Sequence, residues 1–473
     1  MKQLYSHTKI ILALLGASFF IHSAFGQSAH TEYFMSSSYF KTSLNPALRP
    51  SRGYIGIPVL TNISVGYRTN TFALDNFLFP GVGENGKTGL FLNENVSYDQ
   101  FMNGISDQNY LNLDLNETIL GFGFYAGNAF LTVDASLRIN AGINIPKDVF
   151  DFLKKGVTLD GNDKTYDLSN VSLDAIAYGQ IGLGGSFSLL DNSLLLGVKV
   201  NALLGLANGL INLDKMKLNI RRDQWSVTET QASIQLAMKG LKPKYNEEDG
   251  RFDGFDSDDV AIGVNGFGLG FDLGAALKLG CLAGNKSSFL DNLTVSAAVT
   301  DLGYIKWDNS LYLATNPTDI IISGDKEISF ENSENIFADL EDSFKDAYDF
   351  KEKPDKIEEK TNLNAKFNWG IEYAFSKNVH VGFLSTTHFN SIKTISEYTV
   401  GGAIRPVDGL EAGLSYSFIH GGFQTVGLSL HLGPFFYIAS DYVFPKTNSM
   451  FIPVSAKALN LQIGLAIPIG KSR

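Results

Sequence analysis

Residues 263–280 read GVNGFGLGFDLGAALKLG, and such a glycine-rich stretch could either wrap a phosphate group or form a strand with two unlike faces. A dinucleotide-binding loop needs the spacing G-x-G-x-x-G at a strand-to-helix turn. Here Gly268 and Gly270 are followed by Leu273 where the third glycine is required, and no helical periodicity follows. The stretch is therefore predicted to be a β-strand and not a nucleotide site.

The same stretch alternates between apolar and small or polar residues, and successive strand side chains point to opposite faces. Gly268, Asp272 and Lys278 are expected to point into a lumen. A basic residue on the lipid face of a barrel costs about 2–4 kcal/mol, whereas a lumen position tolerates charge. Phe271→Arg is therefore expected to do more harm than Asp272→Arg. The residues predicted to face lipid are Phe267, Leu269, Phe271, Leu273, Leu277 and Leu279.

Two further sets of residues could bind metal or catalyse a reaction. The acidic stretch EEDGRFDGFDSDDV (247–260) offers the carboxylates that Ca²⁺ prefers, but it lacks the Asp-x-Asp-x-Asp-Gly spacing of a specific loop, so a solvated external loop is favoured. No His-Glu-x-x-His pair and no Gly-x-Ser-x-Gly elbow occurs. His380, His388 and His431 lie on the polar parity of their strands, which is typical of a lumen lining.

A barrel hydrolase built from one serine and one histidine would leave no motif, and no such pair is recognisable in this chain. The sequence is therefore predicted to encode no enzyme, no cofactor site and no metal site.

Composition restricts the class of protein. The chain has 473 residues and a formal net charge of −11, which argues against nucleic acid as a partner. Its single cysteine, Cys281, excludes an intramolecular disulfide framework. Charged residues make up 18% of the chain, below the roughly 25% of an ordinary soluble domain.

The first residues predict export. Lys2 and Lys9 precede an apolar run over 10–21, and the small residues Ala24 and Gly26 precede Gln27. This order is typical of a secretory signal peptide over 1–26, cleaved before Gln27. Residues 27–52 are then expected to form an N-terminal plug or turn segment, and residues 53–473 an outer-membrane β-barrel.

Alternating segments of strand length recur along the whole chain, and no later apolar run reaches the roughly 18–20 residues of a membrane-spanning helix. In lipid every backbone polar group must be paired, so strands cross a membrane only as a closed barrel. A secreted sandwich or propeller also has alternating strands, but its strands tend to be shorter, near 5–6 residues. The fold is predicted to be an all-β transmembrane antiparallel barrel.

The connections separate by length. Numbering the strands in order, the long connections, such as 68–108 and 306–362, follow odd strands, and the short ones, such as 126–128 and 376–378, follow even strands. Outer-membrane barrels have an even strand count, short periplasmic turns and long external loops. The pattern predicts 14 strands with both ends periplasmic, or 16 if the charge-rich residues 210–239 form an additional pair.

Local signals refine this prediction. The alternation in 109–125 changes parity near Glu117, which indicates a β-bulge. PKDVFDFLKKG (146–156) predicts a short helix that begins after Pro146. Another long loop, residues 331–360, carries apolar residues at helical spacing between acids. It is either an amphipathic helix folded on its own loop or a lid or docking helix over the barrel mouth.

Two segments carry a resemblance to known proteins. SSYFKTSLNPALRP (37–50), followed by a strand from Gly53, and VTDLGYIKWDN (299–309) resemble the FadL family of long-chain fatty-acid transporters and the FadL-like outer-membrane barrels of Bacteroidetes. The match to the motif near the mature N-terminus is Asn45-Pro46-Ala47. An Asn-Pro step favours extended backbone at the asparagine. The chain departs from the family in its short segment 27–52 and in lacking a terminal aromatic residue.

The resemblance implies a barrel in the outer membrane of a Gram-negative bacterium, surrounded by lipid. The preferred interpretation is a passive channel for small hydrophobic molecules, gated around Asn45, Pro46 and Ala47. The alternative is a non-transporting scaffold that presents its long acidic loops to a protein of a secretion or surface assembly. Inward glycine and aspartate in 263–280 fit either a wet lumen or close packing against a plug.

Overall fold

The structure, a computed structural model, describes most of the chain after residue 28. The predicted signal peptide (1–26), the amphipathic residues 337–348 and part of the acidic stretch 247–260 lie outside the described residues. Those described are 29–155, 163–221, 224–245, 252–256, 259–282, 288–308, 310–315, 320–323, 350–352, 360–407, 409–419, 423–433, 435–441, 455 and 457–471.

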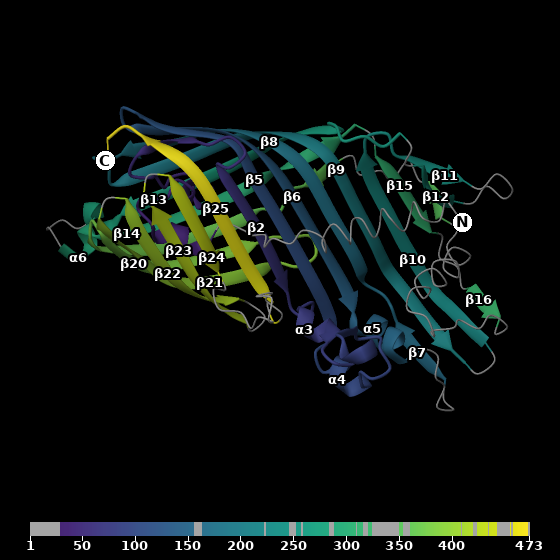
Figure 1. Cartoon of the computed structure of the whole chain (residues 1–473). Helices are drawn as coiled ribbons and strands as arrows, with labels where there is room; N and C mark the ends of the chain where they lie inside the picture. Colours follow the sequence, from purple (N-terminus) through teal and green to yellow (C-terminus); the bar gives the residue numbers. More distant parts are fainter. Residues whose placement is uncertain are drawn as a thin grey trace.

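Strands occupying fourteen antiparallel positions form one closed barrel, as the sequence predicts (Figure 1). Nine positions are single strands, and the other five are strands interrupted by a break or a loop. In order around the wall the positions are β1–β2 (Gly53–Gly56, Asn62–Thr69), β5 (Gln108–Ala126), β6 (Ala129–Pro146), β7–β8 (Lys164–Asp167, Val171–Leu189), β9 (Leu194–Ile220), β10 with β13 (Gln224–Met238, Gly266–Lys278), β14–β15–β16 (Leu293–Trp307, Leu311–Thr315, Ile320–Ser323), β17–β18–β19 (Phe350–Glu352, Lys360–Asn362, Lys366–Ser376), β20 (Val379–His388), β21 (Ile395–Val407), β22 (Leu410–Ile419), β23 (Phe423–Leu432), β24 (Phe436–Asp441) and β25 (Ala458–Ile469).

The last strand closes the wall onto the first. β25 pairs with β24 on one edge and with β1 and β2 on the other, with Gly53 opposite Ile469 and Tyr67 opposite Leu459. Closure leaves no row of unpaired backbone groups, which is the condition for a sheet in lipid.

The count is fourteen and not sixteen because one long strand has two partners on the same side. β9 pairs through 194–205 with β13 and through 207–220 with β10. β10 and β13 therefore share one position in the wall, and β11 and β12, which lie between them in the sequence, form a separate small sheet. The charge-rich 210–239 region extends β9 and supplies β10, and it adds no separate hairpin to the ring.

The first strand is broken where the sequence predicts one continuous strand. β1 and β2 are separated by residues 57–61, and Pro58 has no N–H to donate to a ladder. Thr61 Oγ1 donates to the carbonyl oxygen of Ile57 at 3.0 Å, and Val59 has a positive φ of 69°. The break turns Val59 and Leu60 outward, where both are exposed.

Among the bulges of the wall, one lies in β5 and another in β14. The one predicted near Glu117 is confirmed, because the register between β5 and β6 shifts between Thr118 and Leu120. A second lies in β14, where Asp272 of β13 stands opposite both Thr300 and Asp301. A bulge of this kind places two successive side chains on one face, and here Thr300 and Asp301 are both buried.

The two ends of the barrel differ. The connections at the end that holds Gly53 and the C-terminus are short except for the one between β13 and β14, which carries η3 and α6, whereas α3, α4 and α5 cluster near β7 at the other end (Figure 1). We call the end with α3, α4 and α5 the external end, because outer-membrane barrels have their short turns in the periplasm, and this orientation stays a prediction. The helix predicted from PKDVFDFLKKG is confirmed as α5. The elements outside the wall are η1 (His30–Phe34), α2 (Lys41–Leu44), α3 (Leu74–Phe77), β3 (Leu78–Phe79), η2 (Glu84–Gly86), β4 (Gly89–Leu90), α4 (Tyr98–Met102), α5 (Lys147–Lys155), β11 (Lys242–Tyr245), β12 (Phe252–Asp256), η3 (Leu279–Leu282) and α6 (Ser288–Asp291).

The external helices form a compact unit with its own aromatic core. Phe77, Phe91, Phe101 and Phe150 lie with ring centroids 4.3–6.4 Å apart, and this cluster holds α3, α4 and α5 together. Asp151 adds ion pairs to Lys164 at 2.9 Å and Lys155 at 3.5 Å. Partial burial raises the pKa of Asp151, but hydrogen bonds and the nearby lysines outweigh burial and lower it.

The outer surface of the wall is apolar. Phe267, Leu269, Phe271 and Leu273 of β13 are exposed by 43–59%, as are many outward residues of the other strands. Leu277 is half-buried near the strand end, and Leu279 lies beyond β13 in η3. Among the described residues, no helix has the length and apolar character needed to cross a membrane.

The outward position of Phe271 gives a first prediction. Phe271→Arg should lower the free energy of unfolding in lipid vesicles by about 2–4 kcal/mol, because the guanidinium must lie at hydrocarbon depth. Phe271→Leu, which keeps an apolar group at the same position, should cost much less. Urea titration of the refolded barrel, followed by tryptophan fluorescence, measures both values. Equal loss in the two variants would contradict the assignment of this face to lipid.

Candidate functional site

The N-terminal segment 29–50, here called the plug, lies inside the barrel. Its apolar side chains form the largest buried cluster in the described chain together with residues of the inner wall. Ala29, Phe34, Met35 and Ala47 have no exposed surface. Tyr39 stacks on Tyr54 of β1 with ring centroids 4.8 Å apart.

Glycines of the inner wall make room for the plug. A Cβ atom on Gly370 would lie 2.8 Å from the Tyr33 ring, and one on Gly401 would lie 2.6 Å from the Phe34 ring. At Gly197 a Cβ would collide with the backbone of Pro46 and Ala47. These distances are shorter than real Cβ contacts, so the wall is shaped to this segment. The other inward glycines that touch the plug are Gly274, Gly382, Gly413, Gly427 and Gly464.

Polar contacts fix the plug to several strands. The backbone N–H groups of Ser36 and Ser37 donate to the Glu411 carboxylate at 2.7 and 2.9 Å. The Asn368 side chain donates to the Leu44 carbonyl at 2.7 Å, and Tyr125 donates to the Pro50 carbonyl at 2.6 Å. Each contact satisfies a buried backbone group of an otherwise irregular segment.

The predicted gate residues lie at the centre of this arrangement. Asn45 is extended (φ −154°), as the Asn-Pro step predicts, and its amide donates to the carbonyl oxygens of Ala275 at 3.2 Å and Ala297 at 3.3 Å. The Ala47 N–H donates to Asn45 Oδ1 at 2.9 Å. Pro46 and Ala47 pack against Gly197. The inward glycine and aspartate of β13 thus serve two purposes, because Gly274 abuts Asn45 while Asp272 joins a polar network.

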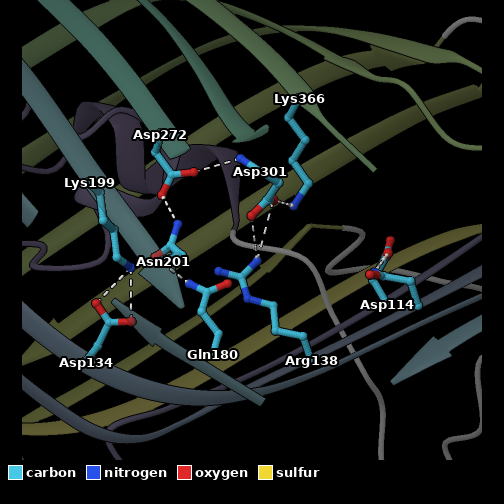
Figure 2. A network of polar contacts seen from close by, with 10 residues as sticks. Asp114, Asp134, Arg138, Gln180, Lys199, Asn201, Asp272, Asp301 and Lys366 are labelled. Carbon is cyan, nitrogen blue, oxygen red and sulfur yellow. Dashed lines mark hydrogen bonds and ion pairs between the residues drawn. The ribbon is translucent and has the colours of Figure 1, made fainter. Parts of the chain in front are cut away.

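Asp301 is the centre of that network (Figure 2). Its carboxylate pairs with Arg138 at 3.2 Å and with Lys366 at 3.2 Å, and its N–H donates to Asp272 at 2.7 Å. The bulge in β14 makes this possible, since Asp301 has a φ of 58°, a left-handed conformation that aspartate tolerates better than most residues.

The network continues around the wall (Figure 2). Asn201 donates to Asp272 at 3.2 Å and accepts from Gln180 at 3.0 Å, while Lys199 pairs with Asp134 at 2.7 Å. Strands β6, β8, β9 and β13 thus all contribute to this group of polar contacts. Asp272 is consequently buried and bonded, so Asp272→Arg would break the network. The sequence predicts that this inward position tolerates a charged substitution, but the buried hydrogen bonds of Asp272 argue against such tolerance.

A cavity of about 110 Å³ lies between the network and the plug. Its charged side is formed by seven ionisable side chains of the wall. Its aromatic and apolar side is formed largely by the plug, through Tyr39, Phe40 and Pro46, with Tyr54 and Phe130 of the wall. The charged residues that line it are Asp114, Asp134, Arg138, Lys199, Asp272, Asp301 and Lys366.

The connection between β20 and β21 folds back over the lumen on the external side. Ser391 bonds to Asp174 of β8, and Ile392 packs against Gly142 of β6. Lys393 lies 4.7 Å from the centre of the Tyr110 ring. This inward loop and the plug narrow the barrel from opposite ends.

One serine–histidine pair occurs in the plug region. Ser37 Oγ lies 2.8 Å from His431 Nδ1 and also bonds to Glu411. In a hydrolytic triad the acid orients the histidine, whereas Glu411 here contacts the serine and its neighbouring N–H groups. The arrangement therefore anchors the plug and does not form a triad.

Sequence reasoning identified only part of this site. Asn45, Pro46, Ala47 and Asp272, which the sequence singled out, lie near one another, since Gly274 of β13 abuts Asn45. That the first three residues form a gate stays a prediction. Lys278, expected to point inward, is exposed at the end of β13. The residues missed were Asp134, Arg138, Lys199 and Lys366. Each of these is a charged residue at an inward-facing position of a strand whose other face is apolar. The alternation predicts that they point inward, but it does not show which of them contact one another.

Comparison with known proteins identifies a family. Residues 46–441 match a family described as "Family of unknown function (DUF5723)". The chain belongs to this family. The matched range runs from Pro46 of the plug to Asp441 in β24 and so contains the lumen network. A search of curated proteins finds no match.

Solved structures with a similar outline include hydrocarbon channels. The TodX monoaromatic hydrocarbon channel deltaS2 mutant has a TM-score of 0.41 and 10% identity, with 94% of this chain and 97% of that chain covered. The Pseudomonas putida toluene transporter TodX gives 0.37 and 9%, with 94% and 97% covered. The CymD monoaromatic hydrocarbon channel gives 0.36 and 11%, with 93% and 94% covered. Because these scores lie below 0.5, we base the function on this chain's own geometry.

The fit between Gly197 and the plug yields a second prediction. Gly197→Val should leave the barrel folded but displace the plug, because the new side chain occupies the space of Pro46 and Ala47. Limited proteolysis should then cut within 29–50 at least about tenfold faster than in the wild type. Gly179→Ala on neighbouring β8 is the control, since its Cβ would meet nothing closer than 3.7 Å. Unchanged protection in Gly197→Val would contradict the packing described.

A third prediction concerns the network. Asp301→Ala leaves Arg138 and Lys366 without their shared carboxylate, and removal of one partner of a buried pair costs about 3–5 kcal/mol. The barrel should therefore unfold at lower temperature, seen as the loss of the compact band on unheated gels. Glu229→Ala, which removes the exposed partner of Lys217, should have little effect. Equal stability of the two variants would show that Asp301 is dispensable.

Proposed function

We propose that the protein is a gated channel of a Gram-negative outer membrane, which admits small molecules with an apolar part. The plug, residues 29–50, is the gate, and Asn45, Pro46 and Ala47 are its central contact with the wall. The observation that carries this proposal is the cavity whose aromatic side is formed by the plug together with Tyr54 and Phe130 of the wall. A ligand that occupies the cavity contacts the gate directly, through Tyr39, Phe40 and Pro46.

The lining of the cavity supports the class of ligand. An apolar or aromatic group would be buried against Tyr39, Phe40 and Tyr54, while most of the remaining lining is polar or charged. The opposite side offers Arg138, Lys199 and Asp134 for a polar substituent. A molecule with one apolar end and one polar end therefore suits this cavity better than a purely aliphatic one.

The outer surface supports the location. The apolar band formed by residues such as Phe271, Leu183 and Val400 would lie in the hydrocarbon of the membrane, with lipid as its neighbour. The external helical unit and the long loops would face the medium.

A second candidate function rests on the external unit. The aromatic core around Phe101 and Phe150 makes α3, α4 and α5 a preformed surface on a barrel whose lumen is largely filled. A scaffold that presents this surface to a protein of a secretion or surface assembly needs no pore. The plug would then be a permanent part of the core.

A fourth prediction separates the two functions. Deletion of residues 30–48 should convert an almost impermeable barrel into an open pore, measured as conductance in planar bilayers and as liposome swelling. Deletion of 242–256, a β-hairpin of similar length that pairs only with itself, should leave the barrel closed. In the wild-type barrel, the slow entry of a small aromatic probe should exceed entry of a sugar of similar size, because the cavity lining contains Tyr39, Phe40 and Tyr54.

The outcomes assign the function as follows. A folded barrel that stays impermeable without the plug would exclude the channel and favour the scaffold. If sugar and aromatic probe enter the wild-type barrel equally, the proposed gate still stands, but the proposed preference for apolar solutes does not. Compact migration of each variant on unheated gels shows that the barrel itself is folded in every comparison.

A further inference from the structure

The first ordered turn of the plug brings together three groups that can bind a metal ion. His30 Nδ1 lies 3.1 Å from Glu397 Oε1 of β21 and 3.3 Å from Asp441 Oδ2 of β24. The three side chains are 2%, 3% and 6% exposed. Within the described chain this is the one cluster of three such donors close enough to share an ion.

The spacing of these donor atoms fits a small divalent ion. Zn²⁺ binds histidine nitrogen and carboxylate oxygen at about 2.0–2.2 Å in a tetrahedron, which places its ligand atoms roughly 3.3 Å apart. The two separations from His30 Nδ1 match that spacing closely. An imidazole with two carboxylates suits Zn²⁺ and neighbouring transition metals better than Ca²⁺ or Mg²⁺, which prefer oxygen alone.

Groups around the cluster hold the donors in place. Arg68 Nη2 lies 3.5 Å from Glu397 Oε2, the oxygen that does not face His30. Asn460 Nδ2 donates to Asp441 Oδ2 at 3.0 Å. Metal-binding carboxylates are usually oriented by such outer hydrogen bonds and ion pairs, which makes the donors preorganised.

A second observation concerns the buried polar groups next to the three donors. Glu32, two residues further along the plug, is fully buried, and its carboxyl group interacts with Tyr437, Asp441 and His30. Asp441 Oδ1 is buried and has no hydrogen-bond partner among the described residues. Buried polar atoms without partners are rare in folded proteins and point to a missing ion or water.

We propose that His30, Glu397 and Asp441 form a binding site for one divalent transition-metal ion of the zinc type. The ion joins the start of the plug to β21 and β24, on the side of the lumen opposite to the contact of Pro46 with β9. The proposal does not depend on transport, because metal content is measured directly on the folded protein.

The test uses the full chain, purified in mild detergent and stripped of metal with a chelator. After incubation with Zn²⁺ and removal of excess ion, mass spectrometry of the elements should find about one Zn²⁺ per chain. Co²⁺ should give the visible absorption of a site with nitrogen and oxygen ligands. His30→Ala and Asp441→Asn should each weaken Zn²⁺ binding at least about 100-fold, as expected for loss of a direct ligand.

Two variants serve as matched controls. His380→Ala removes a histidine that also lies on the inner wall, 3.0 Å from Glu372, but that pair lacks a third donor. It should bind Zn²⁺ as the wild type does. His30→Lys replaces the imidazole by a cation, so it preserves an ion pair with Glu397 and Asp441 but cannot supply the same ligand. It should lose the metal while protease protection of the plug is retained.

Two results would overturn the site. One is a folded wild-type barrel that retains less than about 0.1 Zn²⁺ per chain and gives no Co²⁺ spectrum. The other is unchanged metal binding in both His30→Ala and His30→Lys. Either result would assign His30 to an ion pair that fastens the plug, with no metal involved.

Discussion

The structure depends on one constraint: every backbone N–H and carbonyl in the wall must be paired within the protein, because lipid offers no partner. Closure of β25 onto β1 and β2 meets this requirement and creates an interior that must itself be filled. The plug fills this interior. Its irregular backbone is acceptable inside because Glu411, Asn368 and Tyr125 supply the hydrogen bonds that a helix or sheet would otherwise provide.

Filling the interior determines the composition of the wall. Several inward positions next to the plug are glycines, such as Gly274 and Gly401, where any larger side chain would collide with it. Inward positions beyond the plug carry charges that pair across strands, as Asp301 does with Arg138 and Lys366. The outer face of the strands is therefore apolar throughout, whereas the inner face carries glycines at some levels of the barrel and charged residues at others. The cavity lies where glycine gives way to charge.

The plug is attached to the wall at several points, and the kind of contact differs between them. Pro46 and Ala47 are held against Gly197 mainly by shape, whereas His30 is held by the charges of Glu397 and Asp441. The contact of His30 depends on charge and so responds to the chemical environment, whereas the contact of Pro46 and Ala47 depends on packing. A segment fastened in both ways can be released at one end while the other stays in place, which is the property that a gate requires.

The sequence by itself determined the barrel, because alternation and loop length are local properties: the strand over 266–278, the bulge near Glu117 and helix α5 all appear where predicted. It left 14 and 16 strands open, since only the pairing of β9 with both β10 and β13 shows that these two share a position. It also suggested Asn45, Pro46 and Ala47 but not their surroundings. Tertiary structure alone decided that Asp301 meets Arg138, 163 residues away, and that His30 meets Asp441, 411 residues away, because charge partners in a barrel are set by strand register and closure.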